Sequence, residues 1–285
     1  MTTEKQNMDA VMMCKTTAQN EITVLIDWLS FTMWDLSVRD VMEQILGFSC
    51  ESFVRRGERV YGYRTRYEYQ PNENIFILAD GTPEQGIHVV MSGQGCRQFL
   101  SNDEICSLLG RVLKAGGSFS RLDLAMDDWQ NVYRVQQLAA HQRKLEIMSR
   151  WHYATTDIRH RLSNGDVHRE VIYFGSEQSD YNLKVYNKTL EQHQKSNVTI
   201  ADVPETWVRW EFCTRRDKAQ ELAQMLYQAK NFYRVFTEQL DGSMRITKAE
   251  DAIQNRKRWK TRPKWERFIR MLQDVSAKQE NLKAA

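Results

Sequence analysis

A tyrosine flanked two residues on either side by lysines is an unusual combination for a predicted strand. Along the predicted strand Tyr181–Asn187, alternation places Lys184 and Tyr186 on one face, and Lys188 continues that face. The two ammonium groups favour a nearby phosphate and lower the free energy of forming a phenolate. Tyr186 is therefore a candidate nucleophile toward phosphorus, with both lysines as catalytic partners. A half-exposed strand with solvated lysines would carry the same residues.

Four acidic side chains occupy predicted strands, a setting that strand propensity disfavours: Asp27, Asp123, Asp127 and Glu211. Alternation puts Asp123 and Asp127 on one face of the predicted strand Ser118–Trp129, so both carboxylates can bind one hard cation. Mg²⁺ and Mn²⁺ prefer such oxygen ligands. The four residues are therefore candidate metal ligands. The alternatives are solvated aspartates on an edge strand and, for Asp27, a paired carboxylate at a bulge.

Taken together, these groups indicate chemistry on a phosphodiester. A divalent metal ion held by carboxylates polarises the phosphodiester, and a tyrosine oxygen can then attack phosphorus in line. The lysines offset the negative charge that builds on the phosphoryl oxygens. A free tyrosine needs this help at neutral pH because its pKa is about 10.

The composition fits one large domain or two small ones in a reducing compartment. The chain has 285 residues and a net charge of +3, and its five cysteines form no CxxC pair. The six histidines form no HxH or HxxxH pair, which argues against a histidine metal site. The chain shows neither a long apolar run nor an N-terminal signal region, so we predict a cytoplasmic protein with no membrane partner.

A basic segment near the C-terminus contrasts with the nearly neutral whole. From Arg256 to Arg270 there are eight lysines and arginines against one acid, Glu266. Basic residues interleaved with aromatic ones suit phosphate contacts and base stacking, whereas a solvated helix end with docked tryptophans is the alternative. The predicted DNA-binding residues are Arg121, Arg209, Arg256, Lys257, Arg258, Trp259, Lys260, Arg262 and Lys264.

The apolar patterns predict an α+β fold, an antiparallel sheet with helices packed on one face. Further strands are predicted at Glu21–Met33, Asn74–Asp80, Gly86–Ser92, Glu170–Phe174 and Thr206–Thr214. Trp151–Arg161 is predicted to be a strand or a mobile arm. Helices are predicted at Leu36–Leu46, Asn102–Ala115 with an Asn or Asp cap, Val132–Ser149 and Arg215–Ala229.

The order of these elements predicts a duplication. In residues 21–117 and again in 118–240, a strand with an acid precedes a helix and a hairpin, and another strand and helix follow. Residues 21–240 would form this catalytic and DNA-binding domain. Residues 1–20 are predicted to be a flexible tail, and 241–285 a basic aromatic segment in which Pro263 begins a helix.

Six segments, in this order, resemble the replication initiation factors (the Rep-trans type) of rolling-circle plasmids and filamentous phages, a group that includes some conjugative-element relaxases. The segments are IDWLSFT at 26–32, HVVMSGQGCRQF at 88–99, RLDLAMDD at 121–128, YFGSEQSDYNLKVYNKTLEQ at 173–192, WVRWEF at 207–212 and NRKRWKTRPKWERF at 255–268. The resemblance covers most of the chain. Six ordered motifs are more specific than any one of them.

The resemblance implies a duplicated HUH-like (RRM-like) palm in which carboxylates replace the usual histidine pair as metal ligands. It also implies an enzyme that nicks one DNA strand, leaving a 5′-phosphotyrosyl link and a free 3′-OH. By motif, the nucleophile falls on Tyr186 and the metal ligands on Asp123 and Glu211. Asn187 stands where the family usually has aspartate, and Tyr181 is the nearest rival nucleophile.

The function that follows from the resemblance is initiation of rolling-circle replication. Its partners would be origin DNA, as duplex or hairpin and single-stranded at the nick, and a host helicase, since the sequence has no Walker A motif. A homodimer, or a second nucleophile, is one way to complete the cycle. The alternatives are a conjugative relaxase with the same chemistry and a non-catalytic DNA-binding repressor or scaffold that keeps the fold.

Overall fold

The structure, a computed structural model, describes residues 22–57, 59–194, 203–250 and 253–284. The tail predicted at residues 1–20 lies outside them. The strands are β1 (Thr23–Met33), β2 (Phe53–Arg56), β3 (Thr65–Tyr69), β4 (Ile75–Ala79), β5 (Ile87–Ser92), β6 (Ser118–Asp128), β7 (Ile147–Ser149), β8 (Ala154–His160), β9 (Val167–Phe174), β10 (Tyr181–Asn187), β11 (Val208–Arg215) and β12 (Met244–Ile246).

Four helices of the described residues are at least twelve residues long. The α-helices are α2 (Val38–Asp40), α3 (Gly93–Cys96), α4 (Asn102–Lys114), α5 (Val135–Arg143), α6 (Lys188–His193), α7 (Asp217–Ala229), α8 (Phe232–Ser243) and α9 (Pro263–Ala284). A π-helical turn, η1 (Val41–Leu46), extends α2. The 3-10 turns are η2 (Cys50–Ser52), η3 (Pro83–Gln85) and η5 (Arg256–Arg258).

A large antiparallel sheet with helices confirms the predicted α+β class. Its strand order is β2-β3-β4-β5-β1-β6-β11-β10-β9-β8, and β12 pairs with β7 in a separate two-stranded sheet. The chain divides into two compact units, each discontinuous in sequence. The N-terminal unit comprises Leu25–Leu124 and Cys213–Phe232, and the C-terminal unit comprises the described residues before Leu25, Ala125–Phe212 and those from Tyr233 onward. The predicted duplication stays a prediction.

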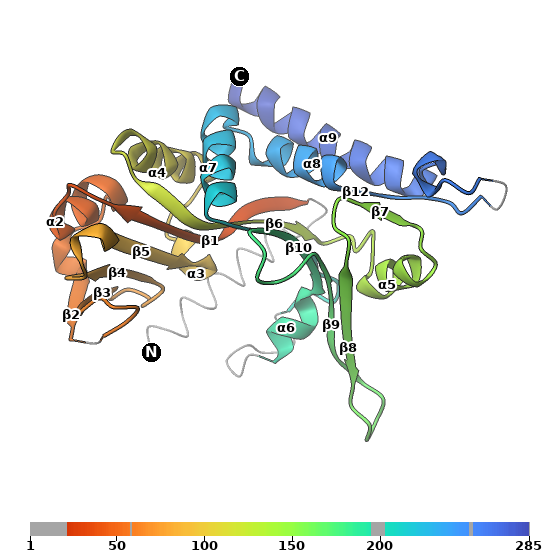
Figure 1. Ribbon diagram of the computed structural model, residues 1–285, viewed down its shortest axis with the longest axis horizontal. Coiled ribbons are helices and arrows are strands. Elements are labelled where there is room, and N and C mark those ends of the chain that lie inside the picture. The colour runs from red at the N-terminus through yellow and green to blue at the C-terminus, as the bar shows by residue number, and fades with distance from the viewer. Residues whose placement is uncertain (1–21, 58, 195–202, 251–252, 285) are drawn as a thin grey trace. The chain divides into compact units, whose positions relative to one another are not determined.

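In the N-terminal unit, strands β2 to β5 form an antiparallel series, and β1 pairs with β5, with Trp28 opposite Ser92 (Figure 1). Helix α4 begins with a capping box, a pattern in which a serine and an acid three residues later bond each other's backbone. Its cap is Ser101, which pairs with Glu104, rather than the Asn or Asp expected from the sequence. The helix ends at Lys114, before Gly116 with a φ of 73°.

In the C-terminal unit, two helices cover one face of β11. Trp210 contacts Trp265 and Phe268 of α9, with ring centroids 6.2 and 5.6 Å apart, and Phe212 contacts Phe236 of α8 at 5.3 Å. These rings are all buried. Because successive strand side chains alternate, the opposite face of β11 presents Arg209 and Glu211. Helices α8 and α9 therefore cover the face of β11 opposite to the one on which the candidate site lies.

The prediction of a long helix at Val132–Ser149 is wrong in the length of the helix. Helix α5 ends at Arg143, Leu145 adopts a left-handed φ of 58°, and β7 follows. The Glu146 carboxylate is buried between His141 and Arg262, each 2.6 Å away, and the backbone oxygen of Glu146 accepts a bond from Thr247. Bonds to distant partners outweigh the helical propensity of the sequence here.

Burial of one acid makes the free energy of unfolding depend on pH. Asp128 is fully buried, and burial raises its pKa to about 6, although backbone N–H groups, first that of Val132, oppose the rise. The folded chain then holds a proton that the unfolded chain releases, so stability falls as pH rises from about 4 to about 6. The cost above this window is about 3 kcal/mol or less.

We therefore expect Asp128→Asn to flatten this pH dependence and to lose least stability at pH 8. Urea unfolding at pH 4.5 and pH 8 measures the effect. Asp166→Asn is the matched control because Asp166 is exposed in a loop. A variant whose unfolding free energy varies with pH as steeply as that of the parent protein would contradict the assignment.

None of the helices in the described residues combines the length and the apolarity that crossing a membrane requires.

Candidate active site

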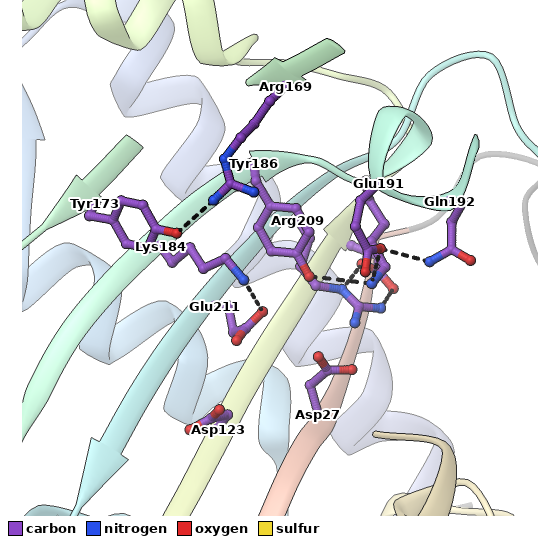
Figure 2. Close-up of polar contacts among 12 residues, drawn as sticks. Asp27, Asp123, Arg169, Tyr173, Lys184, Tyr186, Glu191, Gln192, Arg209 and Glu211 are labelled. Carbon is purple, nitrogen blue, oxygen red and sulfur yellow. Dashed lines mark hydrogen bonds and ion pairs between the residues drawn. The ribbon is translucent and has the colours of Figure 1, made fainter. Parts of the chain in front are cut away.

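Tyr186 sits on β10, and Figure 2 shows its ring near Lys184 and Arg209. The ring is 6% exposed and packs with Val171 and Tyr173 of the adjacent strand β9. The ammonium of Lys184 lies 4.0 Å from the ring centroid. The register of β9 and β10 pairs Tyr186 with Val171 and Lys184 with Tyr173, so all four share one face. The predicted alternation of this strand is therefore confirmed.

Lys188 directs an ammonium group at the hydroxyl of Tyr186. The Nζ atom donates to Tyr186 Oη over 3.4 Å, and it also contacts Glu191 Oε2 at 2.6 Å. Lys188 is the first residue of α6, and its backbone N–H is fixed by the carbonyl oxygen of Trp207 at 2.8 Å. Its side chain is buried, so its charge acts on the hydroxyl with little screening by water. A cation so placed favours the phenolate form of the tyrosine.

Glu211 reaches the same site from β11. Its Oε2 lies 3.8 Å from the Nζ of Lys184, which is thus shared between this carboxylate and the ring of Tyr186 (Figure 2). Both glutamate and lysine are largely removed from water, with side-chain exposures of 7% and 27%. Tyr186, Lys184 and Glu211, three of the candidate site residues predicted from sequence, therefore lie together in the C-terminal unit.

Three buried side chains have the chemistry and spacing to hold a metal ion. One ligand atom from each of Asp123, Glu211 and Cys213 lies within 4.8 Å of the others. Among the residues that the structure describes, this is the one group of three such ligands. Neither Asp127 nor Asp27 belongs to it. Cys213 was not predicted, although alternation along β11 places it on the same face as Glu211.

Asp123 is oriented by an arginine of its own strand. Arg121 donates to both carboxylate oxygens, at 3.1 and 3.2 Å from Nε and 2.5 Å from Nη2. The guanidinium also lies over the ring of Trp28, 4.4 Å from its centroid. A carboxylate has about four lone-pair sites, so Asp123 can keep this bidentate pair and still bind a cation. Arg121 is 32% exposed, which leaves it accessible to a DNA phosphate.

Asp127 and Arg209 form an ion pair in the interior. Arg209 Nε and Nη2 donate to the two carboxylate oxygens of Asp127 over 2.6 and 2.7 Å, and the side chains are 0% and 3% exposed. Breaking such a pair leaves an uncompensated buried charge. Arg209 can therefore contact DNA, and Asp127 a metal ion, only if the pair separates. In the structure, the two residues stabilise the C-terminal unit.

Asp27, on β1, lies in the same unit as Asp123 and is drawn near it in Figure 2. One of its carboxylate oxygens is 3.8 Å from Arg97 Nη2, and Gly93 approaches so closely that a Cβ there would be 2.6 Å from Asp27 Oδ1. Gly93 belongs to the SGQG segment, so this glycine is needed for the close approach of the acid. The alternative reading of Asp27 as a paired carboxylate agrees with this contact.

Tyr181, the rival nucleophile, points to the helix-covered face of the sheet. Its hydroxyl bonds Gln239 Oε1 at 2.8 Å and Ser243 Oγ at 3.0 Å, both on α8, and its ring stacks between Trp151 and Phe212. Burial raises its pKa. A tyrosine used in this way is a structural residue, so Tyr186 keeps the role of candidate nucleophile.

Tyr173 is a neighbour that the sequence did not single out. Its hydroxyl accepts a hydrogen bond from Arg169 Nη2 at 3.1 Å. Burial raises the pKa of Tyr173, and the Lys184 cation opposes the rise. Glu191, Arg169 and Tyr173 thus complete the surroundings of Tyr186. Because Tyr173 faces Lys184 across the ladder, only the strand register could have revealed it.

The basic segment is divided between exposed and structural residues. Lys257, Arg258 and Lys260 are exposed. Arg256 donates to the Leu145 carbonyl and Arg262 contacts Glu146, while Trp259 donates to the Ile253 carbonyl and Lys264 lies over the ring of Tyr133. Pro263 begins α9 as predicted, and Trp265 is buried in the core. The alternative reading, a tryptophan docked on the body, therefore applies to Trp265, and DNA contacts by the exposed residues stay a prediction.

Comparison with known proteins identifies two families and similar chains. Residues 117–284, more than half of the chain, match the family described as "Replication initiation factor", and residues 23–106 match "Rolling Circle replication initiation protein N-terminal domain". A curated relative, the "Putative DNA relaxase NicK" of Bacillus subtilis, is 28% identical over 256 residues, which are 88% of this chain and 72% of the relative.

A solved structure shares the fold. It is the rolling-circle replication initiator protein from Geobacillus stearothermophilus, with a TM-score of 0.78 and 24% identity over 89% of this chain and 97% of that one. The six ordered motifs and these matches agree with one another. The chain belongs to the replication initiation factor family, as the resemblance predicted.

Proposed function

We propose that this protein initiates rolling-circle replication by nicking and rejoining one strand of origin DNA, with Tyr186 as the nucleophile. The observation that carries the proposal is the hydrogen bond from the buried Lys188 ammonium to the hydroxyl of Tyr186. Family membership supports the reaction class. The relatives that are named for initiation and relaxation of DNA support the substrate class.

In the nicking step, the Tyr186 oxygen forms a bond to phosphorus and the bond from phosphorus to the 3′ oxygen breaks. The Lys188 ammonium donates and cannot accept a proton, so the proton of the tyrosine passes to solvent water, and the departing 3′ oxygen takes a proton from water to become 3′-OH. In the joining step, a 3′-OH attacks the phosphotyrosine and the tyrosine hydroxyl is restored. Lys184, above the ring, stabilises negative charge in both directions.

Glu191 marks the place that a phosphate would take. Its carboxylate contacts Lys188 at 2.6 Å, although Glu191 itself is 38% exposed. A DNA phosphate carries the same charge and can replace this carboxylate at the ammonium group. Binding of the scissile phosphate would then bring phosphorus to the side of Lys188 on which the Tyr186 hydroxyl lies.

The carboxylates fit a divalent cation. We infer that Asp123 and Glu211 hold Mg²⁺ or Mn²⁺, since both are buried and their oxygens are hard ligands. When bound, the ion supplies Lewis-acid polarisation of the phosphodiester. The thiol of Cys213 is a softer donor, and its presence in the group favours Mn²⁺ over Mg²⁺. Arg121 fixes the orientation of the Asp123 carboxylate.

Exposed basic side chains would contact the origin DNA. Lys257, Arg258 and Lys260 are the exposed members of the basic segment and suit phosphate contacts. A separate helicase would continue the unwinding. A homodimer, one way to complete the cycle of joining, stays a prediction.

A conjugative relaxase with the same chemistry is the second candidate. The name of the Bacillus subtilis relative favours it. The two functions differ in the DNA that is nicked, a replication origin or a transfer origin. The test uses two supercoiled plasmids, one with the replication origin and one with the transfer origin of the replicon that encodes this chain. Selective nicking of one plasmid separates the two functions.

The test of the proposed chemistry is a covalent adduct. We expect a labelled single-stranded origin oligonucleotide, incubated with Mn²⁺, to become linked to the protein and to migrate with it on a denaturing gel. Mass mapping should place the link on the peptide that contains Tyr186. A protein that binds this DNA without forming an adduct would be the non-catalytic scaffold.

A further inference from the structure

Strands β8 and β9 form an arm beyond the rest of their unit. Their far ends and the loop between them project past α6 (Figure 1). The strands pair antiparallel from Ala154 opposite Phe174 to His160 opposite Val167, with an irregularity after Arg159. β8 is the last strand in the order of the sheet, so no strand of the described residues pairs with its outer edge. An irregular edge strand resists pairing with another protein strand.

The far part of the arm gathers exposed arginines. Residues 157–170 contain Arg159, Arg161 and Arg169, against the acids Asp157, Asp166 and Glu170. Arg159 and Arg169 stand directly opposite each other in the ladder, where like charges are unfavourable. Both contact the single carboxylate of Asp157, at 2.9 and 2.8 Å, so two guanidinium groups share one acid. Their side chains are 65% and 43% exposed.

At the tip of the arm, a basic and an apolar residue are both exposed. Leu162 is 100% exposed, the highest value among the large apolar residues that the structure describes, and it follows the exposed Arg161. The turn that presents them is held by backbone bonds between Arg161 and Gly165 and between Arg161 and Asp166, each of 2.8 Å. Gly165, with a φ of 79°, permits this turn. An ordered turn therefore presents a fully exposed leucine.

The base of the arm is part of the candidate active site. Val171 and Tyr173 of β9 pack against Tyr186, and Arg169 joins the arm to the hydroxyl of Tyr173. The Asn187 side chain, next to Tyr186, donates to Glu170 Oε2 at 2.9 Å. A polyanion held by the arm would therefore lie next to the nucleophile. Proteins that kink or open DNA combine phosphate contacts with an apolar side chain inserted between bases.

The geometry points to the β8–β9 arm as a surface for the DNA junction beside the nick. Arg159, Arg161 and Arg169 bind the phosphates of the duplex, and Leu162 inserts against the first base pair and unstacks it. The strand thus freed passes along β9 to Tyr186. This inference deepens the proposed function and rests on it for the choice of DNA as the partner.

The phosphate contacts are tested by binding, which needs no cleavage. The probes are a fluorescent forked duplex of arbitrary sequence and a single-stranded oligonucleotide. We expect Arg161→Ala to bind the forked duplex about tenfold more weakly at low salt and to reduce the slope of log K against log salt by about one. Single-strand binding should stay unchanged. Arg39→Ala is the control, because Arg39 is 75% exposed on the other unit.

The wedge is tested by base unstacking. A fluorescent adenine analogue, quenched by stacking, is placed in the first base pair of the fork. We expect the wild-type protein to raise its fluorescence and Leu162→Ala to raise it by less than about a third of that amount. Leu100→Ala, which shortens a leucine that is 80% exposed, should behave as wild type. No rise with the wild-type protein, or an equal rise with Leu162→Ala, overturns the wedge.

The outcomes separate this inference from the proposed chemistry. An unchanged salt slope in Arg161→Ala overturns the phosphate contacts. So does an equal loss of single-strand binding, because the arm would then merely support the site. If no adduct forms at Tyr186 while the fork results appear as expected, the nicking function fails and the arm stands as a DNA-binding surface.

Discussion

Tyr186→Phe is expected to form no covalent adduct and to lose at least about 10⁴-fold in strand cleavage. The substitution removes one oxygen atom, the one to which Lys188 donates. The ring can stay in place, because its contacts with Val171, Tyr173 and Lys184 do not involve the hydroxyl. DNA binding and the free energy of unfolding should therefore change little. The measurement is adduct yield on a denaturing gel together with a fluorescence binding titration.

Tyr173→Phe is the matched control for this experiment. It removes the same atom from the adjacent ring on the same face and breaks the bonds of that hydroxyl with Arg169 and Glu177. We expect adduct formation to persist in Tyr173→Phe, at a rate within about tenfold of the wild type. Tyr181→Phe should also keep the adduct but lose stability, since it breaks two bonds to α8. An adduct that persists in Tyr186→Phe and vanishes in either control would move the nucleophile.

The alternation of side chains along the strands predicted much of the candidate site. Alternation along residues 181–187 predicted that Lys184 and Tyr186 share a face, and the register of β10 confirms it. The same parity places Tyr181, five residues earlier, on the opposite face. The sequence alone therefore separates the two tyrosines onto different faces. It does not tell which face is buried, and the structure shows that α8 covers the face of Tyr181.

Partners that are distant in sequence could not be predicted. Arg209 and Asp127 are 82 residues apart, and each has a plausible role at a DNA site when considered separately. Only the placement of β6 beside β11 reveals that they satisfy each other. The same holds for Glu146, whose buried contacts with His141 and Arg262 end the expected long helix. Local patterns predict elements, whereas side-chain pairing depends on topology.

Glu211→Gln is expected to lower cleavage at least about 10³-fold, equivalent to about 4 kcal/mol of activation free energy. The amide keeps the size of the side chain but loses the charge that a divalent cation requires. Binding of Mn²⁺, followed by electron paramagnetic resonance of the free ion, should weaken by more than about 100-fold. Asp123→Asn should have similar effects, with an added loss of stability because Arg121 loses its charged partner.

Glu191→Gln provides the control for loss of a nearby negative charge. Glu191 also contacts a candidate catalytic residue, Lys188, but it is no member of the group formed by Asp123, Glu211 and Cys213. Its replacement should leave Mn²⁺ binding unchanged, and it frees Lys188 for the phosphate. Glu211→Gln that binds Mn²⁺ as the wild type does would remove this acid from the metal site.

Cys213→Ser then separates hard from soft ions at the site. The substitution replaces a thiol by a hydroxyl, an oxygen donor of similar geometry that favours hard cations. If Asp123 and Glu211 are the principal ligands, cleavage with Mg²⁺ should persist in Cys213→Ser within about tenfold. Loss of cleavage with Mg²⁺ and Mn²⁺ alike would make the sulfur a required ligand. The two carboxylates would then be insufficient to hold the ion, because a buried cation needs its full set of donors to replace the water it gives up.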